Sequence, residues 1–120
     1  MLIRLTSAAG DFEGELYSNP VALELVAQLP LELPFSDFND VEKVARLPRA
    51  LRVSGVPEKD QPAPGEIGYY APTKGLALYY GHVGRWPGLV RIGRFDYDLQ
   101  ALRALDDGVV IRIGRLQRGE

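Results

Sequence analysis

The sequence predicts a mainly β protein, a closed eight-stranded barrel with two short capping helices. Short apolar or alternating segments follow one another closely, prolines and glycines separate them, and only two segments have the periodicity of a helix. The strands are too closely spaced for helical crossovers between parallel neighbours, so we expect an antiparallel sheet. Closing that sheet into a barrel removes its unpaired edges.

Two segments at the amino end predict a β-hairpin. Residues 2–6 are mostly apolar, and residues 7–10 are small and turn-like. Residues 12–17 then alternate apolar and acidic side chains. This alternation is typical of a strand with one buried face.

A short helix is predicted next, over residues 20–29. Asn19 is a good N-cap, and Pro20 at the first helical position gives up no hydrogen bond that the helix needs. Pro30 ends the segment. The helix is too short to be stable alone, so we expect it to pack on the sheet. Its apolar face consists of Val21, Leu25, Val26 and Leu29.

The middle of the chain predicts two strands and a long loop. Residues 31–35 alternate, and Pro34 indicates an edge strand or a bulge. After a turn at residues 36–40, residues 43–47 form a strand that ends at Pro48 and that residues 51–53 are expected to continue. Residues 54–65 hold three prolines and two glycines, which predicts an exposed loop.

The last third predicts a hairpin, a helix and a closing strand. Residues 66–70 and 76–81 flank a turn with proline and glycine. A loop around Trp86 leads into a strand over residues 89–95. Asp98 caps a second helix, whose apolar face holds Leu99, Leu102 and Leu105. Residues 109–116 form the last strand.

Length and composition narrow the function classes. A chain of 120 residues predicts one domain, 1–120. Sixteen acidic and fourteen basic residues give a net charge of −2, which disfavours a nucleic-acid partner. The chain has no cysteine and one histidine, and neither a membrane-spanning run nor a secretory pattern is present. We expect a cytoplasmic protein with no cofactor, no metal and no membrane partner. The sequence does not specify an oligomeric state.

Six residues are candidates for lining a ligand groove. An arginine presents a planar fork for carbonyl groups, a tyrosine offers an apolar face with a polar tip, and a tryptophan in a loop is often used for binding. Each candidate also has a structural interpretation: solvated strand edge for the arginines, core packing for the aromatic residues and loop surface for the histidine. The candidates are Arg49, Arg52, Tyr79, Tyr80, His82 and Trp86.

Other kinds of chemistry find little support in the sequence. Asp37, Asp40 and Glu42 are spaced in a calcium-like way, but the glycine and the final glutamate of a calcium loop are missing, which favours a solvated turn. No serine lies in a Gly-x-Ser-x-Gly elbow, and no glycine-rich phosphate loop is present. Alternation along the predicted hairpin places one tyrosine of each pair, 69–70 and 79–80, inward and the other outward.

The order of several short motifs resembles that of the small bacterial and archaeal cyclophilin-like proteins. Residues 64–72 (PGEIGYYAP) combine a Gly-Glu strand start with a turn containing proline, and residues 76–81 (LALYYG) form an apolar-aromatic strand ending in glycine. Residues 37–44 (DFNDVEKV) and Leu47-Pro48 precede them. The resemblance extends from Ile3 to Ile113 and implies the same closed barrel with two capping helices.

Cyclophilins are prolyl isomerases, and the resemblance implies where such a site would lie. Arg49 is the nearest counterpart of their arginine, and Trp86 corresponds to their tryptophan loop. Leu51 and Val53 stand where their groove floor has phenylalanine and methionine, and their histidine and glutamine lack counterparts. We therefore expect binding of a small molecule or an extended peptide without catalysis. The alternatives are a prolyl isomerase of low activity and a structural or interaction module.

Overall fold

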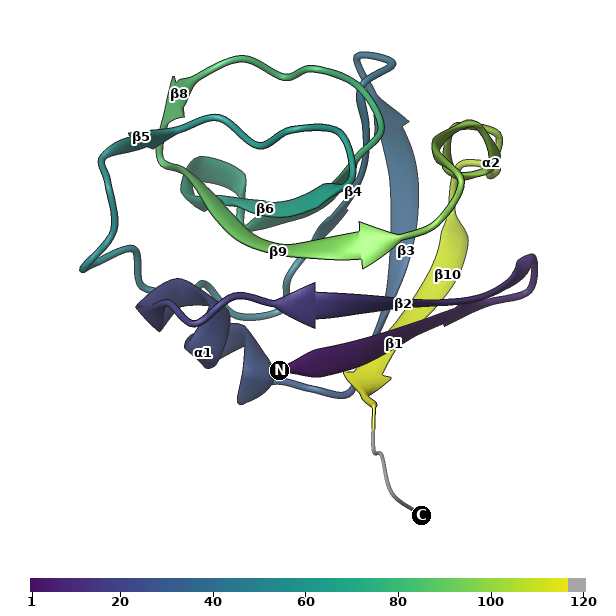
Figure 1. Ribbon diagram of the computed structural model, residues 1–120, viewed down its shortest axis with the longest axis horizontal. Coiled ribbons are helices and arrows are strands. Elements are labelled where there is room, and N and C mark those ends of the chain that lie inside the picture. Colours follow the sequence, from purple (N-terminus) through teal and green to yellow (C-terminus); the bar gives the residue numbers. More distant parts are fainter. Residues whose placement is uncertain (117–120) are drawn as a thin grey trace.

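The eight predicted strands close into one antiparallel barrel. The computed structural model describes residues 1–116 (Figure 1). The barrel confirms the fold class predicted from the sequence. Around it the order is β1 (Leu2–Ser7), β10 (Val109–Arg115), β3 (Leu31–Phe38), β4 (Glu42–Arg46), β7 (Gly75–Tyr79), β6 (Glu66–Tyr70), β9 (Leu89–Asp96) and β2 (Gly10–Leu16).

Alternation along the strands fills the barrel interior with apolar side chains. β1 and β2 form the expected hairpin, with Leu5 opposite Phe12. β10 closes the barrel between β1 and β3, and places Ile111 opposite Leu33. Each large apolar side chain buried in this way stabilises the fold by roughly 1.5–3 kcal/mol. The side chains at 0% exposure include Leu5, Phe35, Tyr69, Leu76, Leu78, Ile92 and Ile111.

Both predicted helices are present, and both are short. In α1 (Pro20–Val26) the Asn19 side chain accepts a hydrogen bond from the Ala22 N–H at 2.9 Å. The helix ends at Val26, short of the expected residue 29, and beyond its C-cap the amides of Gln28 and Leu29 bond three residues back in a tighter turn. In α2 (Leu99–Arg103) Asp98 caps the Ala101 N–H in the same way. The helical residues buried in the main core are Val21, Ala22, Leu25 and Leu102.

The chain after β4 departs from the sequence prediction. Residues 51–53 do not continue a strand, so that prediction is wrong. Instead, the Leu51 N–H donates to the Tyr69 hydroxyl at 2.9 Å, and the Leu51 side chain packs into the core. A backbone amide bonded to a side chain is unavailable for a strand ladder, which explains the irregular path.

The loop over residues 54–65 is tied to a second loop. β5 (Lys59–Asp60) pairs with β8 (Trp86–Pro87), and the two run beside each other above β6 and β9 (Figure 1). The Asp60 carboxylate also accepts a hydrogen bond from the Arg91 N–H at 3.0 Å. This pairing fixes the position of Trp86. A short 3₁₀ turn, η1 (Ala71–Thr73), joins β6 to β7. No helix within residues 1–116 is long and apolar enough to cross a membrane.

Candidate functional site

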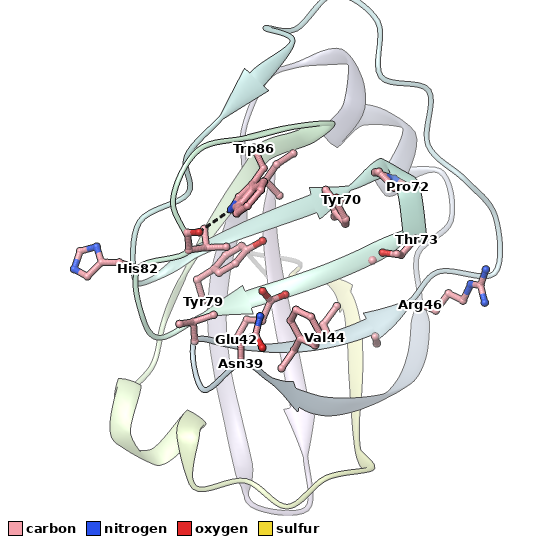
Figure 2. Close-up of a pocket in the computed structure, with 16 residues that line it drawn as sticks. Asn39, Glu42, Val44, Arg46, Tyr70, Pro72, Thr73, Tyr79, His82 and Trp86 are labelled. Carbon is pink, nitrogen blue, oxygen red and sulfur yellow. Dashed lines mark hydrogen bonds between the residues drawn. The ribbon is translucent and has the colours of Figure 1, made fainter.

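A groove of about 760 Å³ lies against the outer face of β4, β7 and β6 (Figure 2). In β7 the residues Leu76 and Leu78 point into the barrel, so Gly75, Ala77 and Tyr79 point outward, and all five are buried. The outward residues belong to a second apolar cluster, separate from the main core. Its members are Ala77, Tyr79 and Leu89, with Val44, Tyr70 and Val83 packed against them.

Tyr79 forms part of the groove floor and is only 1% exposed. Its ring lies over Gly68 of β6. A Cβ at that glycine would come within 2.7 Å of the tyrosine Cε2 atom and 3.3 Å of its hydroxyl oxygen. Gly68 therefore makes the space that the ring occupies. Burial, and then the charge of Glu42, raises the pKa of Tyr79, so the hydroxyl stays protonated and can donate a hydrogen bond.

Glu42 places a carboxyl group in the groove. It begins β4, directly opposite Tyr79 on β7, and it is 8% exposed. Its carboxylate makes no hydrogen bond or ion pair with any other residue between 1 and 116. Burial raises the pKa of Glu42 to about 7, and the nearby charge of Asp37 adds to the shift. Near neutral pH this side chain is therefore divided between its charged and neutral forms.

The charged neighbours of Glu42 are engaged with each other. The buried Lys43 ammonium donates to a backbone carbonyl after α2 at 2.6 Å and lies 3.7 Å from Asp37. The Arg103 guanidinium of α2 donates two hydrogen bonds, of 2.9 and 2.7 Å, to the Asp40 carboxylate. The Tyr80 hydroxyl donates to Asp37. This network ties the turn between β3 and β4 to α2, and it engages both cations with partners other than Glu42.

Trp86 lines the groove from β8. Its indole N–H donates to the Val83 carbonyl at 2.9 Å, which orients the ring, while 53% of the residue stays exposed (Figure 2). Two other charged or titratable residues mark the ends of the groove. His82 points outward at one end and Arg46 points outward at the other (Figure 2).

The six residues that the sequence suggested for a ligand groove do not lie together in the structure. Tyr79, His82 and Trp86 line the groove. Tyr80 packs against the main core, as Tyr69 does, whereas Tyr70 and Tyr79 belong to the outer cluster. One tyrosine of each pair therefore lies on each side, as the alternation predicts. Arg49 and Arg52 line a smaller cavity of about 240 Å³ beside α1. The arginines and the aromatic residues therefore do not share one site.

The sequence did not predict that Glu42 lines the groove. The sequence groups it with Asp37 and Asp40, but the structure turns it away from both, into the groove. The alternation of β4 could have indicated it, because Glu42 lies two residues before Val44 and therefore on the same face of the strand. Within residues 1–116 no three histidine, aspartate or glutamate side chains are arranged to hold a metal ion.

The chain belongs to the cyclophilin-like family, whose sequence model matches residues 5–114. This confirms the resemblance drawn from its motifs. The solution structure of a hypothetical protein from Archaeoglobus fulgidus is similar, with a TM-score of 0.72 and 20% sequence identity. The alignment covers 97% of this chain and 95% of that one, and at this identity it shows a shared fold. No curated protein matches the chain significantly.

Proposed function

We propose that this domain binds a small molecule or an extended peptide in the outer groove, without catalysis. The supporting observation is the hollow of about 760 Å³, floored by an apolar cluster outside the barrel core. Its volume lies in the range that ligand pockets use. The main core already fills the barrel interior, so the outer cluster is not needed to close the fold. A hollow with a mostly apolar lining and a few polar groups commonly marks a binding site.

The groove is largely formed before any ligand arrives. Gly68 seats the Tyr79 ring, and the Val83 carbonyl and the pairing of β5 with β8 orient Trp86. A site on paired strands loses little conformational freedom on binding, so more of the free energy of apolar burial appears as affinity. That burial contributes roughly 25 cal/mol per Å².

The polar groups of the groove favour binding over prolyl isomerisation. Isomerisation must lower a barrier of about 18–20 kcal/mol, which requires a hydrogen-bond donor that favours the twisted amide over the planar one. Arg49, the arginine implied by the resemblance to cyclophilins, lies at the separate cavity beside α1. Arg46 lines the groove but points outward at its end (Figure 2). Neither guanidinium is placed over the floor where a proline ring would lie.

Filling the groove should abolish binding of an apolar probe. We expect Val44→Trp to weaken binding of the neutral dye N-phenyl-1-naphthylamine by at least about tenfold, because the larger ring occupies the floor. The measurement is dye fluorescence against protein concentration. Val110→Trp is the matched control, since Val110 is 51% exposed on β10. Trp86→Ala, which removes an exposed wall, should also weaken binding without unfolding the protein.

Two results would contradict the proposal. One is a native protein that does not enhance dye fluorescence at any protein concentration up to about millimolar. The other is a folded Val44→Trp protein that binds the dye as tightly as the native protein does.

A further inference from the structure

The groove contains a buried carboxyl group that no residue between 1 and 116 pairs with. Glu42 is more than nine-tenths buried, yet no other residue between 1 and 116 donates a hydrogen bond to it or pairs with it. Burying an unpaired charge is costly, and folded proteins normally pair such groups or neutralise them. An acidic group of this kind at the wall of an open groove is suited to a partner from outside.

Among residues 1–116, no cation forms an ion pair with Glu42. The ammonium of Lys43 and the guanidinium of Arg103 are engaged by Asp37 and Asp40, and by a backbone carbonyl. At the two ends of the groove, Arg46 and His82 point outward (Figure 2). The neighbouring charge that acts on Glu42 is the Asp37 carboxylate, which itself lies 3.7 Å from the already bonded Lys43 ammonium.

The surroundings of Glu42 also suit a cation. Tyr79 stands directly opposite it, and Tyr70 and Trp86 line the same groove from β6 and β8 (Figure 2). Aromatic faces attract ammonium and guanidinium groups, and Tyr70 and Trp86 are the two rings here that are accessible enough to present a face. In such a site the carboxylate pairs with the cationic group of the ligand, and the aromatic rings contact the apolar carbons next to it.

We infer that the groove selects ligands that carry an alkylammonium or guanidinium group, held by the Glu42 carboxylate among Tyr79, Tyr70 and Trp86. This inference rests on the proposed binding function and specifies its ligand class. An apolar body fills the floor of the groove, and the cationic head reaches Glu42. An anionic ligand of the same shape is rejected, because the Glu42 carboxylate in the groove would repel it.

Three compounds of one shape test the selection. We expect phenethylamine, as its ammonium ion, to bind at pH 8 about tenfold more tightly than neutral 2-phenylethanol, and 3-phenylpropionate to bind least. The readout is the change in backbone amide NMR shifts around Glu42, Tyr79 and Trp86. A short peptide with lysine, compared with its norleucine analogue, separates a peptide side chain from a free amine as the source of the cation. Preference for the charged member of either pair supports the inference.

Two variants test whether Glu42 is responsible for the preference for cationic ligands. In Glu42→Gln, phenethylamine and 2-phenylethanol should bind within about twofold of each other. The control Glu32→Gln changes an exposed residue of β3 and should keep the native preference. Affinity for the amine should also rise from pH 6 to pH 8 in the native protein, and not in Glu42→Gln. Persistence of that rise in Glu42→Gln would overturn the role of Glu42.

Failure of the inference is distinguishable from failure of the proposed function. If N-phenyl-1-naphthylamine binds but the amine and the alcohol bind equally, and the lysine and norleucine peptides do too, the groove is a binding site without cation selection and the inference is wrong. If the dye, the three compounds and both peptides all leave the groove resonances unchanged, the proposed function fails and the inference fails with it.

Discussion

Replacing Glu42 with glutamine is expected to stabilise the protein at pH 8 by about 2 kcal/mol. The physical reason is that burial raises the pKa of this group from 4.5 to about 7, so the fold holds a charge at pH 8 that the unfolded chain accommodates more easily. The full shift would correspond to about 3 kcal/mol, and contact with solvent through the groove reduces it. The melting temperature should rise by roughly 6–10 °C.

The sign of this effect depends on pH. Between pH 4.5 and about 7 the folded state binds more protons at Glu42 than the unfolded state, so its contribution to stability falls as the pH rises through this window. At pH 4 both states are protonated there, and the native and Glu42→Gln proteins should unfold alike. Urea unfolding at pH 4 and pH 8 measures the difference, with Glu32→Gln as the control. Equal stability of the native and Glu42→Gln proteins at pH 8 would show that the carboxylate is solvated.

Glu66→Ala is expected to destabilise the protein by about 2–3 kcal/mol at pH 7. Glu66 is 8% exposed. Its carboxylate accepts hydrogen bonds from the Arg91 guanidinium at 2.9 and 2.7 Å, the Tyr17 hydroxyl at 2.7 Å and the Ala63 N–H at 2.8 Å. Removing it leaves three sets of donors without their acceptor. Because the Arg91 side chain is 46% exposed, it can regain water, which keeps the loss below that of a fully buried pair.

This effect has the opposite dependence on pH. Burial alone would raise the pKa of Glu66, but Arg91, the Ala63 N–H and Tyr17 outweigh burial and hold the pKa below its usual value. The stabilisation is therefore complete above the unfolded pKa and is lost as the pH falls through the lowered folded value. Urea unfolding at pH 7 and pH 2 measures it. Glu15→Ala breaks an exposed pair with Arg94 and should cost at most about 1 kcal/mol. A loss from Glu66→Ala no larger than this control would contradict the structural role.

The barrel was predictable because each strand carries its own signal. Alternation, apolar runs and bounding prolines or glycines mark all eight barrel strands, and the caps Asn19 and Asp98 mark both helices. These signals act over a few residues, so no long-range information is needed to read them. The resemblance to the cyclophilin-like family rested on the same local motifs and is confirmed.

The groove was only partly predictable, because it depends on contacts between distant segments. Trp86 takes its place through β8 pairing with β5, a two-residue ladder that leaves no pattern in the sequence. Arg49 was expected at the ligand groove, but the chain turns away after Pro48, and the Gln28 amide holds the Arg49 carbonyl beside α1 at 3.2 Å. Glu42 pairs with no residue between 1 and 116, where Lys43 and Arg103 are engaged elsewhere, and only the folded structure reveals that arrangement.

The acidity of Glu42, measured with and without a cationic ligand, tests the central claim most directly. In protein labelled with ¹³C at glutamate, the side-chain carboxyl resonance of Glu42 follows its protonation. We predict a pKa of about 7 in the free protein and a lower pKa when phenethylamine is bound, because the ammonium ion favours the charged carboxylate. A pKa near 4.5 that the amine leaves unchanged would contradict the account, since Glu42 would then be neither buried in the groove nor its binding group.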